Sequence, residues 1–258
     1  MNNKIKKILN KKNKSKIVCL TSYSKNIAEE ADKYADIILV GDSLGSVLYN
    51  YDTTRKVTLT NMIDHSKSVR LGVKKSLMVV DMPYNTYNSK NLALKNAKKI
   101  MKETKCDAVK LEGGKSIIEQ VKHLINNKIP VMGHLGLLPQ TNKGNFSSKG
   151  KTNREKKKLI SDALLLQRCG VFSIVLELIK TSTAKEITQK LMIPTIGIGS
   201  SINCDGQVLV TDDLIGLNDT KIKFVKKFAN TKKYLSFGIK KFASEVKSKK
   251  YPQKKHSY

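Results

Sequence analysis

The chain has 258 residues, of which 40% are hydrophobic and 27% charged, and a formal net charge of +28 at pH 7. This length is typical of one (β/α)8 barrel, and no apolar run approaches the roughly 18 residues that a transmembrane helix requires. Because 45 of the 49 basic residues are lysine, the charge predicts weak, salt-sensitive attraction to polyanions and no specific recognition of nucleic acid.

Strand and helix patterns alternate along the chain. The predicted strands are short apolar runs at residues 17–21, 37–40, 77–80, 108–111, 130–135, 173–176, 195–198 and 207–210. The predicted helices lie at residues 28–34, 60–71, 89–102, 116–126, 154–168 and 183–191. Thr60 and Ser89 are the expected N-caps of two of them. This order predicts an α/β fold, a closed (β/α)8 TIM barrel forming a single domain over residues 1–258, with an open doubly wound sheet as the alternative.

Both ends of the chain carry an apolar stripe at helical spacing. Ile5, Ile8 and Leu9 predict a short N-terminal helix that packs on the barrel. A helical tail is predicted near the C-terminus from Leu235, Ile239, Phe242 and Val246.

Two features of the sequence bear on where the protein resides. The basic N-terminal stretch lacks the apolar core of a signal peptide. Four dispersed cysteines favour reduced thiols over a disulfide framework or a zinc site: Cys19, Cys106, Cys169 and Cys204. We therefore expect a cytoplasmic protein.

Four of the apolar runs end on a carboxylate, at Asp42, Asp81, Glu112 and Glu177. Because a (β/α)8 barrel gathers its active-site groups at the C-terminal ends of its strands, this pattern predicts an enzyme. Asp42, Asp81 and Glu112 offer three hard oxygen ligands with room for water, which suits Mg²⁺. The alternative is that each acid caps the following helix or pairs with a lysine.

Three further strand-end side chains allow more than one role. Lys110 lies two residues before Glu112 and faces the same side of its strand, toward the barrel interior. There it would suit an anionic substrate, unless it forms an ordinary buried salt bridge. His134, between glycines, could polarise a substrate oxygen or be a core histidine. Glu177 could be a fourth ligand, a general base or a structural acid.

Several short motifs follow one another between residues 16 and 216. They are Val40-Gly41-Asp42-Ser43-Leu44-Gly45, Asp81-Met82-Pro83-Tyr84, Val109-Lys110-Leu111-Glu112-Gly113-Gly114, Gly133-His134-Leu135-Gly136-Leu137, Pro139-Gln140, Leu176-Glu177, Pro194-Thr195-Ile196-Gly197-Ile198-Gly199 and Cys204-Asp205-Gly206-Gln207-Val208-Leu209-Val210. In this order they resemble the ketopantoate hydroxymethyltransferase family of pantothenate synthesis. Each motif is short, and the combination is specific.

The resemblance implies a barrel of the phosphoenolpyruvate/pyruvate type. It implies transfer of a hydroxymethyl group from 5,10-methylenetetrahydrofolate to 3-methyl-2-oxobutanoate, forming 2-dehydropantoate. One Mg²⁺ per subunit would be held at the positions matching Asp42, Asp81 and Glu112, and Glu177 matches the family's proton acceptor. Family members form homo-oligomers, typically decamers, and we expect neither a membrane nor a specific nucleic acid among the partners.

The resemblance also implies substrate contacts. Positions matching the family's substrate-contacting residues are Asp42, Ser43, Asp81 and Lys110, to which we add His134 from its place at a strand end.

Three segments depart from the family pattern. Leu178-Ile179-Lys180 stands where the family usually has a small residue and Val-Pro, and Ser200-Ser201 stands in place of Ala-Gly. The polar loop at residues 141–152 keeps little of the family's lid sequence. These departures affect the expected lid closure and folate contacts more than the metal site.

Two other functions fit the same residues. One is a different 2-oxo-acid enolate enzyme of the same superfamily, such as a phosphonopyruvate mutase or an isocitrate-lyase-like lyase. The more distant one is a non-enzymatic, basic protein that binds polyanions.

Overall fold

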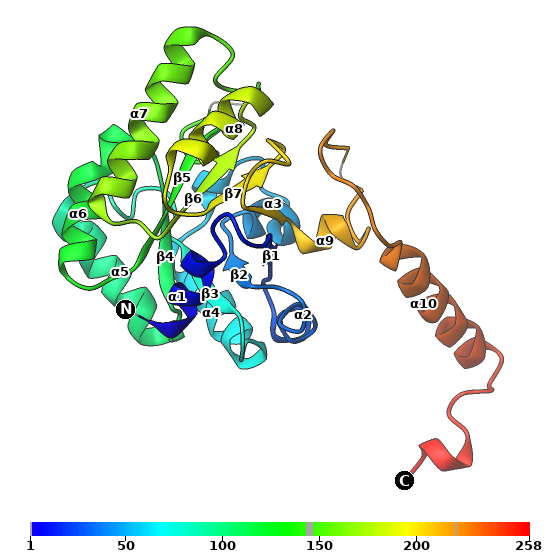
Figure 1. The fold of residues 1–258 in the computed structure, drawn as a ribbon. Helices are drawn as coiled ribbons and strands as arrows, with labels where there is room; N and C mark the ends of the chain where they lie inside the picture. Colours follow the sequence, from blue (N-terminus) through cyan, green and yellow to red (C-terminus); the bar gives the residue numbers. More distant parts are fainter. Residues whose placement is uncertain (1, 143–146, 220) are drawn as a thin grey trace. The chain divides into compact units, whose positions relative to one another are not determined.

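Eight parallel strands close into one barrel in the computed structural model, which describes residues 2–142, 147–219 and 221–258 (Figure 1). The strands are β1 (Ile17–Thr21), β2 (Ile37–Val40), β3 (Leu77–Asp81), β4 (Ala108–Glu112), β5 (Val131–Gly136), β6 (Ser173–Glu177), β7 (Thr195–Ile198) and β8 (Gly206–Leu209). Each strand pairs with the next, and β8 pairs with β1 to close the ring. The predicted closed barrel is confirmed, and the open sheet is excluded.

Helices follow most of the strands. The α-helices are α1 (Asn3–Asn10), α2 (Lys25–Ala31), α3 (Leu44–Tyr49), α4 (Leu59–Gly72), α5 (Lys90–Thr104), α6 (Ile118–Asn126), α7 (Asn153–Cys169), α8 (Thr181–Lys190), α9 (Thr211–Leu214) and α10 (Thr231–Lys247), with 3-10 turns at Thr54–Lys56, Lys115–Ile117 and Lys254–His256. No helix among the described residues is long and apolar enough to cross a membrane.

The predicted caps are right for one helix and wrong for another. Ser89 caps α5, where its hydroxyl accepts the backbone N–H of Leu92 at 3.3 Å. Thr60, however, lies inside α4, and Thr58 is the cap. The Thr58 hydroxyl accepts the N–H of Asn61 at 3.1 Å, and the Asn61 side chain accepts the N–H of Thr58 at 3.0 Å.

Alternate side chains of the strands fill the barrel interior. These side chains form a buried apolar cluster inside the barrel. On β3, Leu77 and Val79 belong to this cluster, and Asp81, the next alternate residue, points to the same side of the strand. On β4, Ala108 lies in the cluster, and Lys110, two residues later, points to the same side of the strand. The interior therefore changes from apolar to charged toward the C-terminal ends of the strands.

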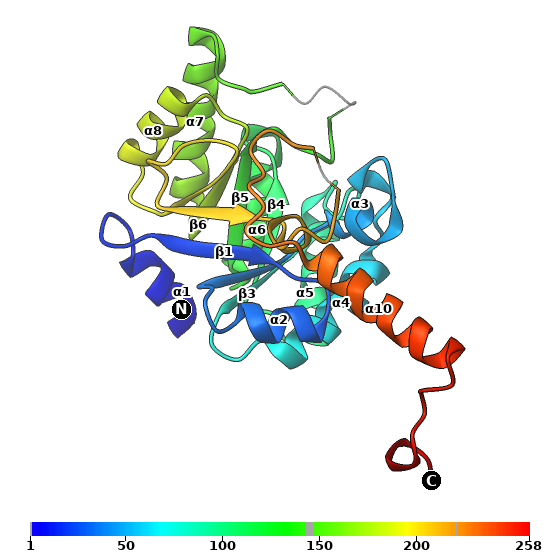
Figure 2. The same ribbon diagram turned by 90° about the vertical axis from the view of Figure 1, so that its right-hand side faces the viewer.

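Helix α1 packs against the apolar end of the barrel, as its sequence predicted (Figures 1 and 2). Ile5 and Ile8 are 1% and 3% exposed, and both belong to the interior cluster. The Lys12 ammonium, just after the helix, lies 2.9 Å from the buried Asp205 carboxylate. These contacts close the end of the barrel opposite the charged one.

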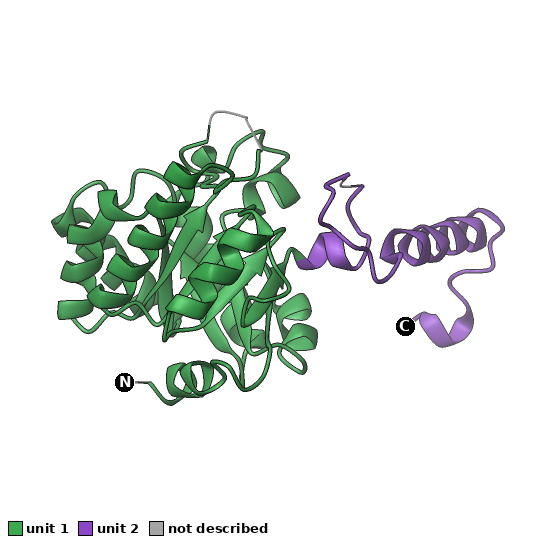
Figure 3. Ribbon diagram, turned by 45° about the horizontal axis from the view of Figure 1, so that its top comes forward, with its two compact units in different colours: residues 1–210 green, residues 211–258 purple. Residues whose placement is uncertain are grey.

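The chain divides into two compact units, residues 1–210 and residues 211–258 (Figure 3). The first unit holds the whole barrel, whereas the second holds α9 and α10. A single domain over residues 1–258 stays a prediction. The predicted C-terminal helix exists as α10, but none of its described residues is buried, and the side chains of its stripe are 45% to 61% exposed.

Candidate active site

The predicted acids lie at or just after the C-terminal ends of β2, β3, β4 and β6. Strand register places Asp81 beside Lys110, and Glu112 beside His134. Glu177 ends β6, which pairs with β5. Apart from Glu177, these side chains are buried.

Asp81 is the centre of the first half of the site. Its Oδ2 accepts the backbone N–H of Asp42 at 3.1 Å, and its Oδ1 lies 3.1 Å from the Lys110 ammonium. Burial raises the pKa of Asp42 well above its usual range, and the nearby charges of Asp81 and Glu112 raise it further. Burial also raises the pKa of Asp81, although Lys110 opposes the shift. Burial and the closeness of the acids therefore disfavour ionisation of Asp42 and Asp81 in the free protein.

His134 connects the second half of the site. Its Nδ1 lies 3.4 Å from Glu112 Oε1 and 3.3 Å from the Lys110 ammonium, while its Nε2 lies 3.3 Å from Glu177 Oε2. Although burial and Lys110 disfavour a charged ring, the two carboxylates raise the pKa of His134 to about 9. The protonated ring in turn outweighs burial and holds the pKa of Glu112 below its usual range.

Glu177 is the accessible member of this chain of contacts. Its side chain is 16% exposed, whereas the His134 side chain is 3% exposed. A molecule that enters from the C-terminal end of the barrel would thus contact Glu177 before it reached the His134 imidazole behind it.

Gln140 is a member of the site that the strand-end pattern missed. It follows β5 in a turn, and 1% of it is exposed. Its side-chain Nε2 donates to Asp42 Oδ2 at 2.8 Å, and its backbone N–H donates to Glu112 Oε2 at 3.1 Å. The Tyr87 hydroxyl donates to its Oε1 at 2.5 Å. The only sequence signal for Gln140 was its place in the Pro139-Gln140 motif.

Ser43 does not join this network. Its hydroxyl lies 2.8 Å from the hydroxyl of Tyr23, and Ser43 is the N-cap position of α3. Its expected contact with substrate stays a prediction. The structure thus brings six of the seven predicted site residues into one network of short contacts.

The donor set fits a hard divalent cation. Asp42, Asp81 and Glu112 supply buried carboxyl oxygens from the ends of three adjacent strands, and the crowding of these acids raises the pKa of Asp42. Among the described residues, however, no three His, Cys, Asp or Glu side chains already surround one common point. An ion here would complete its coordination with water, as Mg²⁺ commonly does.

The polar loop at residues 141–152 is described only in part, because residues 143–146 lie outside the described residues. Its C-terminal part is anchored beside the site. The N–H of Lys149 donates to the carbonyl of Leu178 at 2.8 Å, and the N–H of Lys180 donates to the carbonyl of Lys149 at 2.9 Å. These bonds join the loop to the backbone that directly follows Glu177.

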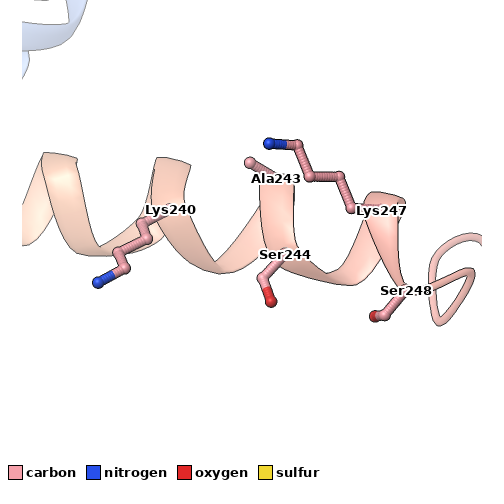
Figure 4. A pocket seen from close by; sticks show the side chains of 5 residues that line it. All are labelled: Lys240, Ala243, Ser244, Lys247 and Ser248. Atoms are coloured by element: carbon pink, nitrogen blue, oxygen red, sulfur yellow. The ribbon is translucent and has the colours of Figure 1, made fainter.

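A surface depression on α10 is a poor candidate for the site (Figure 4). It is lined by Lys240, Ala243, Ser244, Lys247 and Ser248. None of these side chains is a carboxylate or an imidazole, so the depression offers neither a metal ligand nor a general base.

Comparisons with known proteins agree with this geometry. A family model described as ketopantoate hydroxymethyltransferase matches residues 2–254. The 3-methyl-2-oxobutanoate hydroxymethyltransferase of Pelagibacter ubique (strain HTCC1062) is 60% identical over the full length of both chains. The enzyme of the same name from Thermosipho africanus (strain TCF52B) is 48% identical, with 98% of this chain and 97% of the relative covered.

Solved structures of other proteins have a similar fold. A phosphonopyruvate hydrolase in complex with oxalate and Mg²⁺ has a TM-score of 0.63 at 8% identity, covering 99% of this chain and 93% of the other. A 2,3-dimethylmalate lyase of the PEP mutase/isocitrate lyase superfamily has a TM-score of 0.59 at 12% identity, covering 81% and 79%. The barrel is therefore of the type that this superfamily uses.

Proposed function

Since the chain belongs to the ketopantoate hydroxymethyltransferase family, we propose that it transfers a hydroxymethyl group from 5,10-methylenetetrahydrofolate to 3-methyl-2-oxobutanoate. The product is 2-dehydropantoate, a precursor in pantothenate synthesis. The observation that carries the proposal is the chain of contacts from Asp42 and Asp81 through Lys110 and His134 to Glu177. Relatives of the same name at 60% and 48% identity favour this transferase over a mutase or lyase of the superfamily.

Asp42, Asp81 and Glu112 would hold one Mg²⁺ per subunit. When bound, the ion would supply a Lewis acid that stabilises negative charge developing on the keto oxygen of the substrate. The raised pKa of Asp42, caused by burial and by its acidic neighbours, supports a cation at this position, because a cation would relieve the same repulsion.

Glu177 is the proposed general base. It would take the C3 proton of the 2-oxo acid, and the resulting carbanion equivalent would form the new carbon–carbon bond to the methylene carbon of the folate. Water supplies the oxygen of the hydroxymethyl group, both bonds from the methylene carbon to folate nitrogens break, and tetrahydrofolate leaves. His134 holds the Glu177 carboxylate at 3.3 Å and links it to Glu112. Because both ring nitrogens face carboxylates, His134 acts on the substrate through Glu177, and its predicted direct contact with substrate is not needed for this role.

Lys110 is the proposed counter-charge for the anionic substrate. In the structure it pairs with Asp81 and is buried, which matches the salt-bridge alternative as well. Nearby negative charge raises the pKa of Lys110 despite its burial, so the ammonium would remain charged when a carboxylate binds. Ser43 and Asp42 would contact the substrate from the loop that follows β2.

Two properties of the whole protein complete the proposal. We infer a homo-oligomer, such as a decamer, from the exposed apolar stripe of α10 and from the outward face of β1, where Val18 is 43% exposed. We infer a cytoplasmic location from the dispersed cysteines, all four of which are free.

One assay tests the function. Purified protein with 3-methyl-2-oxobutanoate, 5,10-methylenetetrahydrofolate and Mg²⁺ should form 2-dehydropantoate, and EDTA should abolish the product. Without the folate, the protein should still exchange the C3 proton of the substrate with deuterated water. Product formed equally well in EDTA would overturn the proposed metal, and absence of product under all conditions would overturn the proposed reaction.

A variant tests the base. Glu177→Gln keeps the size of the side chain but cannot accept the proton, so we expect C3 exchange to slow by about 10²- to 10⁴-fold. Exchange is followed by loss of the C3 proton signal in NMR. An unchanged exchange rate would assign the base to another group.

A further inference from the structure

Gln140 joins two of the proposed ligands without neutralising either. Its Nε2 lies 2.8 Å from Asp42 Oδ2, and its backbone N–H lies 3.1 Å from Glu112 Oε2. A lysine or arginine at this place would also satisfy the carboxylates, but it would cancel the negative charge that attracts a cation. A neutral amide holds the oxygens and leaves their charge intact.

The amide of Gln140 has only one orientation that satisfies its surroundings. The two N–H groups face acceptors, Asp42 Oδ2 and, at 2.9 Å, the carbonyl of Met82. The amide oxygen faces a donor, the hydroxyl of Tyr87. A flipped amide would place its oxygen against two acceptors, and a buried unpaired polar group is costly. Tyr87 therefore fixes the direction in which Gln140 donates.

We propose that Gln140 is a positioning residue of the cation site, which orients Asp42 and Glu112 as a pair and is itself locked by Tyr87. This inference rests on the proposed Mg²⁺ site. It assigns to a loop residue the task of holding together two carboxylates from strand ends that are not adjacent in the barrel, β2 and β4. Groups that hydrogen-bond metal ligands commonly change metal affinity by 10- to 100-fold when they are removed.

The test measures binding of the metal alone. Mn²⁺, detected by electron paramagnetic resonance and displaced by Mg²⁺, is titrated into the full chain, into Gln140→Leu and into Tyr87→Phe. We expect Gln140→Leu to weaken Mn²⁺ binding by about 10- to 100-fold. We expect Tyr87→Phe, which removes only a hydroxyl, to weaken it by a smaller factor.

Gln167→Leu is the matched control. Gln167 also hydrogen-bonds through its side chain, whose Oε1 accepts the backbone N–H groups of Met192 and Ile193 at 2.6 and 3.3 Å. These bonds lie before β7, at the opposite end of the strands from the acids. We expect Gln167→Leu to leave Mn²⁺ affinity unchanged, even if it lowers thermal stability.

The outcomes separate this inference from the proposed function. If the unmodified chain binds Mn²⁺ and both site variants bind it equally tightly, the positioning role is wrong and the proposed reaction stands. If the unmodified chain binds no Mn²⁺ at millimolar concentration, the proposed metal site fails and the inference fails with it. Should Gln140→Leu not fold, Tyr87→Phe decides, because it leaves the carbon framework of the site intact.

Discussion

At the scale of single residues, the site is a balance of buried charges. Lys110 and Asp81 are 4% and 3% exposed at their side chains and 3.1 Å apart. Such a pair adds little net stability compared with apolar residues, but removing one partner leaves the other charged, buried and unpaired. The loss in the free energy of unfolding should therefore depend strongly on whether one or both charges of the pair are removed.

A double-mutant cycle measures this coupling. In EDTA, Lys110→Met should lower the free energy of unfolding by about 3 kcal/mol, because the Asp81 carboxylate loses its counter-charge. The double variant Lys110→Met with Asp81→Asn should lose less than the sum of the two single variants. Urea unfolding checks both values. Strictly additive losses would contradict the ion pair as the main role of Lys110 in the free protein.

The strand-end residues of the site could be predicted from sequence, but the loop residues could not. Asp81, Lys110 and Glu112 follow from two rules: apolar runs form strands, and every second residue faces inward. Gln140 and Tyr87 obey no such period. Their position depends on how two loops fold over the strand ends, which is decided by tertiary contacts such as the bond from Gln140 to the Met82 carbonyl.

At the scale of elements, the strands were predicted more accurately than the helix ends. The apolar runs predict the strand bounds to within one residue, because most positions inside them are apolar and buried. The predicted start of α4 is wrong by one residue, since Thr58 and Thr60 are both good N-cap residues. Asn61 decides which threonine caps the helix, because it lies three residues after Thr58 and completes a reciprocal capping box with it.

One carboxylate joins elements far from the site and should make stability depend on pH. Asp32, just after α2, accepts backbone N–H groups of residues 74–76 between α4 and β3, with the shortest distance 2.8 Å to Ser76. Although burial favours the neutral acid, these bonds hold the pKa of Asp32 below its usual range. Asp32 therefore stabilises the fold above its unfolded pKa, and this contribution is lost as pH falls through the lower, folded pKa.

Asp32→Asn tests this link. At pH 7 we expect the variant to lose about 1–3 kcal/mol of the free energy of unfolding. The difference from the unmodified chain should begin to shrink near pH 4, about the ordinary pKa of an aspartate. It should vanish as pH falls through the lower pKa that Asp32 has in the folded chain. Urea unfolding across pH gives both values. Asp52→Asn is the control, because Asp52 is exposed and pairs with Lys56 at the surface. A loss at Asp32 that does not depend on pH would contradict the mechanism.

At the scale of the whole molecule, the charge and the apolar stripe of α10 predict different kinds of association. The charge of +28 produces a long-range attraction to polyanions that salt screens. The stripe of Leu235, Ile239, Phe242 and Val246 produces an attraction that salt does not weaken, because burial of apolar surface drives it. An exposed apolar helix face of this extent marks an interaction surface. The salt dependence of association therefore distinguishes binding through the net charge from binding through the apolar stripe.

A single substitution in the stripe should dissociate the proposed homo-oligomer. The unmodified chain should sediment at a multiple of its 28.8 kDa mass at both low and high salt. Ile239→Asp places a charge in the centre of the stripe, so we expect the mass to fall toward 28.8 kDa, whereas Ser244→Asp, on the opposite face of α10, should leave it unchanged. Analytical ultracentrifugation measures all three. A monomeric unmodified chain at micromolar concentration would refute the homo-oligomer, and equal effects of the two substitutions would show that the stripe is not the contact surface.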